Sequence, residues 1–426
     1  MPDDDRPLPT PSRRARVVLG IGGGIAAYKS CELLRRFTES GHDVTVVPTA
    51  AALQFVGAPT WAALSGKPVA TDVWHDVHEV PHVRIGQSAD LVVVAPATAD
   101  LLAKAAHGLA DDLLTNTLLT ARCPVVLAPA MHTEMWEHAA TRDNVATLRA
   151  RGVLVVEPAE GRLTGADTGK GRLPDPTEIF EVAREALARS ASASPLDLAG
   201  RHVVVSAGGT REYLDPVRFL GNRSSGLQGY ALARSAAARG AEVTLLAANV
   251  TLPDPAGVKV LHVETTAQLQ DAVLSASATA DAVVMAAAVA DYRPSTTSDT
   301  KLKKADDGST LALHLEQNPD ILRQLSQHRP HPGMVVVGFA AETGDESATV
   351  LEMGAAKLAR KGCDLLVVND VSGGQVFGSP DNEAVVLDAA GGSTAVPHGS
   401  KSALAHVVWD RVVALLDAVR RTTRAD

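Results

Sequence analysis

Two glycine-containing turns lie where a nucleotide phosphate could bind, and the first follows the apolar run at Val17 near the start of this 426-residue chain. There Gly22, Gly24 and Ala27 are spaced as in G-x-G-x-x-A, a turn whose backbone N–H groups can contact a phosphate. Dinucleotide enzymes add an acid at the end of the second strand to bind the ribose, but here that strand ends at Thr49. The spacing therefore favours a mononucleotide over NAD, and a tight turn without a ligand is the alternative.

The second turn, Gly208-Gly209-Thr210, lacks the third glycine and is a weaker signal by itself. Lysines further along the same half strengthen it, in a polar loop and on one helix face at i, i+4 spacing: Lys301, Lys303, Lys304, Lys357 and Lys361. Several ammonium groups near an anion-binding turn suit a triphosphate. A solvated run of charge is the alternative interpretation of such lysines.

Three histidines, His75, His78 and His82, stand in one segment with Asp76 and Glu79. Metal binding by this group is one hypothesis, although no partner motif for it occurs elsewhere in the chain. A single histidine acting as a base is the other, because its pKa suits neutral pH.

Composition narrows the class of protein. The formal charge of −9 argues against a nucleic-acid-binding surface, and no apolar run approaches the roughly 18 residues of a membrane helix. The N-terminus has acids and prolines instead of a signal-peptide pattern. The three scattered cysteines make neither a disulfide framework nor a metal site. We expect a cytoplasmic protein that handles small molecules, without nucleic-acid or membrane partners.

Apolar runs alternate with helical patterns in the first half of the chain, and the same alternation starts again in the second half. This predicts two α/β domains of the Rossmann type. A tail at 1–14 is expected to be disordered, and the small, polar segment 191–200 reads as a linker between domains at 15–190 and 201–426. Strand-like runs near the C-terminus, including 311–315, 335–339, 365–368 and 384–387, predict some antiparallel pairing.

Several longer motifs resemble a known family. The first half contains GGGIAAYK, APATAD, GLADDLLT and PAMHTEMW, and the second contains AGGTREYLDPVRFLGNRSSG, AAVADYRP, KLKK, NPDIL and GFAAET. Together they resemble the bifunctional phosphopantothenoylcysteine decarboxylase / phosphopantothenate–cysteine ligase of coenzyme A biosynthesis, in the family's order. The resemblance implies a flavodoxin-like FMN-binding decarboxylase domain, followed by a ribokinase/Rossmann-like ligase domain with a mixed sheet.

For the first half, the resemblance implies oxidative decarboxylation with FMN and re-reduction by the flavin. His82 matches the family's active-site histidine, and His132 replaces an asparagine that holds the substrate carboxylate. Gly165 stands where the family has a proton-donating cysteine in a flap, so the resemblance leaves that donor open. The FMN contacts that it implies are Gly24, Ile25, Ala26, Thr49, Ala97, Thr98 and Met131.

For the second half, the resemblance implies that CTP activates 4′-phosphopantothenate as an acyl-cytidylate, which cysteine then attacks, with Mg²⁺ on the triphosphate. Asn222 would contact the acyl-cytidylate, Lys301 would act in catalysis, and Arg218 would meet the substrate phosphate. The residues implied to bind CTP are Ala287, Asp291, Lys301, Pro319, Asp320, Ile321, Leu322, Phe339, Lys357 and Lys361.

The family also implies a homo-oligomer, a dodecamer by analogy. Two rival hypotheses remain open. A nicotinamide-dependent reductase would need a ribose-reading acid, which neither half has. Alternatively, the ligase is active while the first half is a non-catalytic flavoprotein or regulatory binding module, which the absence of the flap cysteine keeps possible.

Overall fold

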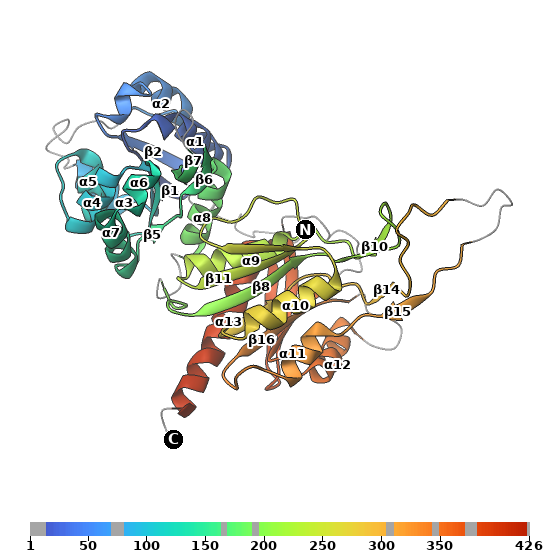
Figure 1. Ribbon diagram of the computed structural model, residues 1–426. Coiled ribbons are helices and arrows are strands. Elements are labelled where there is room, and N and C mark those ends of the chain that lie inside the picture. The colour runs from blue at the N-terminus through green and yellow to red at the C-terminus, as the bar shows by residue number, and fades with distance from the viewer. Residues whose placement is uncertain are drawn as a thin grey trace, which may run out of the picture. The chain divides into compact units, whose positions relative to one another are not determined.

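The computed structural model describes residues 14–69, 81–162, 168–189, 196–303, 311–342, 349–370 and 381–423 (Figure 1). The chain divides into two compact units, Met1–Ala193 and Ser194–Asp426. Residues 1–13 of the expected tail and 191–195 of the expected linker lie outside the described residues, as do His75, His78, Gly165 and Lys304.

The first unit is built on a parallel sheet in the order β2-β1-β3-β4-β5, the flavodoxin-like order. Its strands are β1 (Arg16–Ile21), β2 (Asp43–Pro48), β3 (Leu91–Ala97), β4 (Val125–Pro129) and β5 (Leu154–Val155). They read as continuous apolar runs because helices cover both faces of the sheet, and every residue of β3 is buried. A hairpin of β6 (Ala159–Arg162) and β7 (Thr168–Arg172) follows the sheet.

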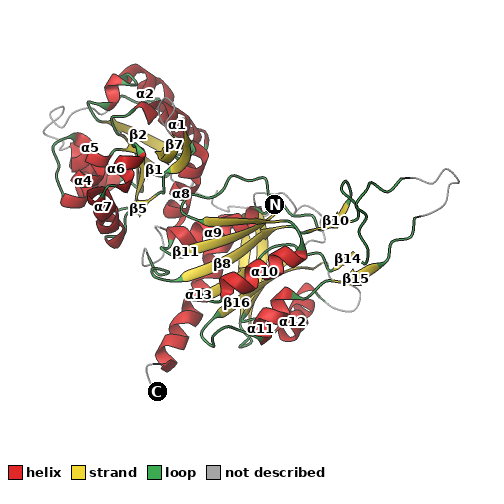
Figure 2. Ribbon diagram, in the orientation of Figure 1, coloured by secondary structure: helices red, strands yellow, loops and turns green. Residues whose placement is uncertain are grey.

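Helices lie on both sides of this sheet (Figure 2). They are η1 (Ile25–Lys29), α1 (Ser30–Glu39), η2 (Ala52–Gln54), α2 (Ala58–Ser65), α3 (Pro81–Ser88), α4 (Ala99–His107), α5 (Leu113–Thr120), α6 (Thr133–Glu137), α7 (Ala139–Ala150) and α8 (Pro176–Arg189). One buried cluster joins the strands to Leu102 of α4, Leu114 of α5 and Leu148 of α7.

The second unit has a mixed sheet in the order β12-β11-β8-β13-β16-β17-β18-β19. Its strands are β8 (His202–Gly208), β11 (Glu242–Ala248), β12 (Lys259–Val263), β13 (Ala282–Met285), β16 (Val335–Glu342), β17 (Leu365–Asp370), β18 (Asp381–Asp388) and β19 (Ser393–Ser400). The pairs from β12 to β17 are parallel, and β18 and β19 are antiparallel. Antiparallel pairing was therefore predicted correctly for 365–368 and 384–387, which pair with each other in that way. The other neighbour of 365–368 is β16, with which it pairs in parallel, and 335–339 pairs only in parallel.

Two helical layers enclose the second sheet. α9 (Leu227–Ala238) and α13 (Lys401–Thr423) cover one face, where Trp409 Nε1 donates to Leu232 O at 2.9 Å. α10 (Thr266–Ser277), α11 (Ile321–Gln327) and α12 (Val350–Lys361) pack on the other. No helix in the described part of the chain is long and apolar enough to cross a membrane.

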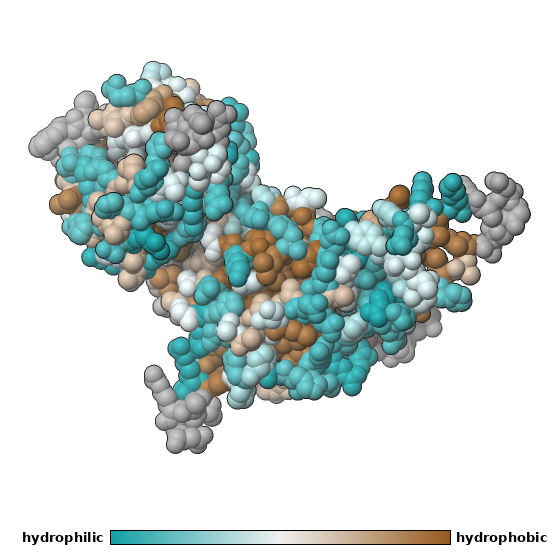
Figure 3. All heavy atoms as spheres, in the orientation of Figure 1, coloured by the Kyte–Doolittle hydropathy of each residue, from teal (hydrophilic) through white to brown (hydrophobic). Residues whose placement is uncertain are grey.

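Two short antiparallel ribbons extend from this unit. One pairs β9 (Arg211–Tyr213) with β10 (Phe219–Gly221), and the other pairs β14 (Tyr292–Pro294) with β15 (Leu315–Gln317). We call these ribbons and the described residues between their strands the arm. The strand predicted at 311–315 is wrong except for its last residue, because 311–314 form no ladder. Apolar side chains are exposed on the arm (Figure 3), among them Val217, Phe219, Leu311, Leu313 and Leu315.

Candidate functional sites

A cavity of about 990 Å³ lies in the first unit at the carboxyl ends of its parallel strands. Its walls are the turns that follow β1, β2, β3 and β4, and part of β7. The strand order reverses between β1 and β3, the point where open α/β sheets bind ligands. The topology therefore brings together segments that are distant in the sequence.

The glycines after β1 are required by close contacts on one side and leave an opening on the other. A Cβ on Gly22 would lie 2.3 Å from Pro96 O, and one on Gly23 would lie 2.3 Å from the Cβ of Ala51. A Cβ on Gly24 would meet nothing within 4 Å. The backbone at Gly24 is thus open to the cavity, and a bound group can approach it closely.

The β6–β7 hairpin packs on the loop that carries His132. Met131 N donates to Gly171 O at 3.0 Å. A Cβ on Gly171 would lie 2.2 Å from Met131 O, and one on Gly169 would lie 2.4 Å from the hydroxyl of Thr133. Only glycine allows this approach, so β7 is fixed beside His132. The side chain of His132 is exposed at the cavity.

Charged side chains line one side of the same cavity. The ammonium of Lys104 lies 3.1 Å from Asp100 and 3.0 Å from Asp111. Hydrogen bonds to Asp111 and Asp100 raise the pKa of Lys104, and the bond from Lys104 lowers that of Asp111. This side of the cavity therefore remains charged at neutral pH.

Most of the predicted FMN contacts lie together. Gly24, Ile25, Ala26, Thr49, Thr98 and Met131 line the cavity, and so does His132, which was predicted to contact the substrate carboxylate. Ala97 is fully buried at the end of β3 and does not line it. His82 does not line it either; it is half-buried on α3, where Thr120 Oγ1 donates to His82 O at 2.9 Å. Its Nδ1 is buried and has no hydrogen-bond partner among the described residues.

The three cysteines do not line either of the predicted sites. None of them lines a cavity described here. Burial raises the pKa of Cys31, and raises those of Cys123 and Cys363 to about 11. Such thiols are poor sources of thiolate, and none replaces the missing flap cysteine.

In the second unit a cavity of about 690 Å³ lies at the carboxyl end of β8, β13 and β16. It brings together Asn222 and all the predicted CTP contacts except Lys301, from five separate segments of the chain: Asn222, Ala287, Asp291, Pro319, Asp320, Ile321, Leu322, Phe339, Lys357 and Lys361. The segment after β13 is held against β8, because Ala287 N donates to Ser206 Oγ at 3.1 Å and Ala288 N donates to Gly208 O at 2.8 Å.

Positive charge enters this cavity from α12. Lys357 and Lys361 lie one turn apart near the end of the helix, as the i, i+4 spacing predicts. The ammonium of Lys361 is 2.6 Å from Asp320 Oδ2. The same Asp320 caps α11 by accepting from Arg323 N at 3.1 Å.

Lys301 and Arg218 do not line the cavity. Both lie on the arm, where the buried carboxylate of Asp215 accepts from Arg218 Nε at 2.9 Å and from Leu302 N at 3.1 Å. Arg218 Nη2 also donates to Leu302 O at 2.6 Å. Burial raises the pKa of Asp215, but the hydrogen bonds from the Arg218 side chain and from the backbone of Val217, Leu302 and Arg218 together outweigh it and hold that pKa far below its usual range. Arg218 thus fixes the main chain beside Lys301.

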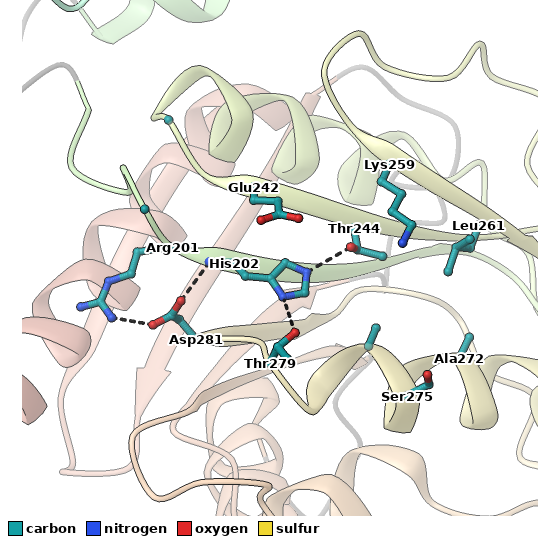
Figure 4. Close-up of a pocket in the computed structure, with 13 residues that line it drawn as sticks. Arg201, His202, Glu242, Thr244, Lys259, Leu261, Ala272, Ser275, Thr279 and Asp281 are labelled. Carbon is teal, nitrogen blue, oxygen red and sulfur yellow. Dashed lines mark hydrogen bonds and ion pairs between the residues drawn. The ribbon is translucent and has the colours of Figure 1, made fainter. Parts of the chain in front are cut away.

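A third cavity, about 700 Å³, lies at the opposite end of the second sheet. His202 lies on its floor, with Nε2 3.1 Å from Thr244 Oγ1 and Nδ1 3.1 Å from Thr279 Oγ1 (Figure 4). Lys259 of β12 also lines it. None of the predicted site residues does.

Sequence reasoning missed the side chains that support the nucleotide cavity from behind. Thr210, Glu212 and Thr266 are buried, and Asn318 joins them to the cavity wall. Their long-range hydrogen bonds have no periodic signal in the sequence. Among the described residues, no group of three or more His, Cys, Asp or Glu side chains is placed to hold a metal ion.

The fold and the cavities at the carboxyl ends of the two sheets define a two-unit α/β protein of the flavoprotein class. Residues 5–188 match the family profile described as "Flavoprotein", and residues 198–416 match "DNA/pantothenate metabolism flavoprotein C-terminal domain". The Coenzyme A biosynthesis bifunctional protein CoaBC of Mycobacterium tuberculosis is 58% identical over 406 residues, covering 94% of this chain and 97% of that protein. The protein of the same name from Bacillus subtilis is 40% identical over 403 residues, covering 94% and 97% respectively.

A crystal structure of the C-terminal domain of a coenzyme A biosynthesis bifunctional protein CoaBC covers 52% of this chain and 99% of its own, at 31% identity and a TM-score of 0.44. The chain belongs to the family of coenzyme A biosynthesis bifunctional proteins CoaBC. It is a bifunctional enzyme of that pathway, and the family and fold class predicted from the sequence are confirmed.

Proposed function

We propose that the second unit ligates 4′-phosphopantothenate to L-cysteine with CTP, and that the first unit decarboxylates the product with FMN to give 4′-phosphopantetheine. The observation that carries this proposal is the convergence of the predicted CTP contacts on one cavity. The ligase would occupy 201–426 and the decarboxylase 15–190, joined by the linker 191–200. The order is chemically consistent because the ligase product is the decarboxylase substrate.

Ligation requires activation because a free carboxylate is too poor an electrophile for an amine. A carboxylate oxygen attacks the α-phosphorus of CTP and pyrophosphate leaves, which gives the acyl-cytidylate. The cysteine nitrogen then attacks the acyl carbon, loses its proton and releases CMP. Lys357 and Lys361 would neutralise the phosphates from α12, while Asn222, whose amide nitrogen is 2.8 Å from Val289 O, would contact the acyl-cytidylate.

Mg²⁺ would accompany the triphosphate. This ion keeps several waters and is bound through substrate phosphates and one or two carboxylates. Asp291 lines the cavity and could supply a carboxylate oxygen, which suits a metal that arrives with the nucleotide. Lys301 and Arg218 remain predicted phosphate contacts, which must reach the ligand from the arm.

The first cavity fits FMN. The open backbone at Gly24 leaves room for a phosphate, and large apolar side chains, Ile25, Tyr28 and Met135, are exposed around the cavity where a planar ring could cover them. FMN bound there would accept the electrons released when the substrate thiol is oxidised and later return them. His132 would hold the substrate carboxylate by donating a hydrogen bond from its imidazole.

His82 does not reach this cavity within one chain. We propose that the active form is a homo-oligomer, a dodecamer by family analogy, in which His82 of another copy completes the decarboxylase site. The exposed apolar residues of the arm would provide a second contact between copies. Mixing His82→Asn chains with His132→Ala chains tests this: dissociation and reassembly should restore part of the decarboxylase activity. Recovery of none in mixed oligomers contradicts a shared site.

The whole proposal is tested with purified, FMN-loaded protein, 4′-phosphopantothenate, cysteine, CTP and Mg²⁺, by following CMP and carbon dioxide together. We expect equal amounts of both. CMP without carbon dioxide would mean that the first unit is a non-catalytic flavoprotein, with Gly165 the first residue to examine. Absence of CMP refutes the ligase assignment. A cytoplasmic location is part of the proposal, and fractionation of cells tests it.

A further inference from the structure

A buried chain of hydrogen bonds lies behind the nucleotide cavity of the second unit. Its members are Thr210 after β8, Glu212 on β9 and Thr266 at the first turn of α10, with side chains 1%, 6% and 0% exposed. None of the three lines the cavity. Any effect they have on a nucleotide must therefore pass through the residues that they hold.

Every hydrogen bond in this buried series is donated toward the Glu212 carboxylate. The Glu212 carboxylate, which the amino end of α10 favours, accepts from Thr266 Oγ1 at 2.7 Å and from Thr266 N at 2.9 Å. A hydroxyl has one proton, so Thr210 must donate in its 3.1 Å contact with Thr266 Oγ1. Thr210 Oγ1 then accepts from Ala290 N at 2.9 Å. The carboxylate thus orients each hydroxyl as far as the cavity wall.

The opposite wall depends on the same hydroxyl. Asn318 Nδ2 donates to Thr266 Oγ1 at 3.3 Å and to Ala290 O at 2.9 Å, and Asn318 N donates to Asp291 O at 2.8 Å. Asn318 itself lines the cavity, in the second wall between Gln317 and Pro319. Both peptide groups of Ala290 are therefore held, and the two walls meet at Thr266.

We propose that Thr266 is a positioning residue for nucleotide binding and discrimination, which sets the spacing of the two cavity walls through Ala290 and Asn318. The inference rests on the proposed CTP-dependent ligation. Removal of the Thr266 hydroxyl leaves the buried Thr210 hydroxyl without its acceptor and takes from the Asn318 amide one of its two acceptors. Such groups are costly to leave unpaired, so the walls shift to find other partners.

The experiment uses the full-length, FMN-loaded enzyme and Thr266→Val, which removes the hydroxyl at nearly constant volume. The KM for CTP should rise about ten-fold, and the preference for CTP over other nucleoside triphosphates should fall. The KM for cysteine should stay within two-fold. Decarboxylation of supplied phosphopantothenoylcysteine should be unchanged, because that reaction belongs to the other unit.

Two further variants separate positioning from general damage. Thr266→Ser keeps the hydroxyl and should restore the KM for CTP and the nucleotide preference. Thr279→Val removes a hydroxyl beyond the other end of α10, where it contacts His202 (Figure 4), and should leave ligation unchanged. If Thr266→Val does not fold, Thr210→Val breaks the same chain and should raise the KM for CTP as well.

Two results overturn the inference, and they are distinguishable. A wild-type enzyme that ligates with CTP, together with a Thr266→Val enzyme of unchanged KM for CTP and unchanged preference but lower Tm, reduces Thr266 to a structural role. A wild-type enzyme that releases no CMP overturns the proposed function, and the inference falls with it.

Discussion

The ion pair between Lys361 and Asp320 gives a prediction whose size follows from the structure. The Lys361 ammonium lies 2.6 Å from Asp320 Oδ2 at the nucleotide cavity, and the two side chains are 19% and 40% exposed. A triphosphate that takes up this ammonium must compete with the carboxylate. The free energy that Lys361 adds to CTP binding is therefore that of a charged hydrogen bond minus that of a partly exposed ion pair.

A hydrogen bond to a charged group contributes about 1.5–3 kcal/mol, and an exposed ion pair about 0.2–1 kcal/mol. The difference is roughly 1–2 kcal/mol, which corresponds to about a 5- to 30-fold change in affinity. Lys361→Met should therefore weaken CTP binding by that factor. Equilibrium dialysis of Mg²⁺–CTP against the full-length protein measures the Kd directly.

Asp320→Asn should act in the opposite direction. Asparagine keeps an oxygen that can cap α11, but it removes the charge that competes for Lys361. CTP binding should tighten by about 1.4- to 5-fold, since the competing pair costs about 0.2–1 kcal/mol. Lys259→Met, which removes an ammonium from the third cavity, is the matched control and should leave the Kd unchanged. A Lys361→Met protein that binds CTP as tightly as wild type refutes the reasoning.

Three further predictions concern the first unit. Gly24→Val should abolish FMN binding, measured by flavin absorbance after gel filtration, without lowering Tm, because its side chain would enter the open cavity; retained flavin would contradict this placement. Gly171→Ala should free the flap for limited proteolysis, since its Cβ would lie 2.2 Å from Met131 O. Burial raises the pKa of Glu157, but Lys170 at 2.8 Å helps to lower that pKa below its usual 4.5. The ionised carboxylate therefore stabilises the fold above pH 4.5. This stabilisation is lost as the pH falls through the lowered pKa of Glu157. Wild-type Tm should consequently fall more steeply below pH 4.5 than that of Glu157→Gln, and equal slopes would count against the pair.

Much of each site could be predicted from the sequence because its signals are local. Strands buried on both faces read as apolar runs, and the turns that follow them carry Gly24, Thr49, Thr98 and Met131. Since parallel strands end at one edge of their sheet, these turns were expected to converge. The i, i+4 spacing likewise placed Lys357 and Lys361 on one face of a helix.

Long-range pairing was not predictable in this way. The strands of the arm are three residues long, too short for a clear alternation of polar and apolar side chains. The segment 311–315 was therefore predicted to be a strand, although only its last residue pairs. Arg218 was expected at a substrate phosphate, but the fold places a buried carboxylate, Asp215, against it. His82 was assigned to the flavin site, and the helix that carries it contributes no residue to the cavity of its own chain.

The sequence by itself determined the two sheets, the glycine turns and the cationic helix face, because periodicity and turn chemistry depend on neighbours along the chain. Only the tertiary structure decided what lies behind those turns. Thr210 and Glu212, Thr266, and Asn318 come from three separate segments, and their hydrogen bonds exist only once β8, β9, α10 and β15 are packed. Such contacts join residues up to 56 positions apart, and no spacing rule along the chain encodes them.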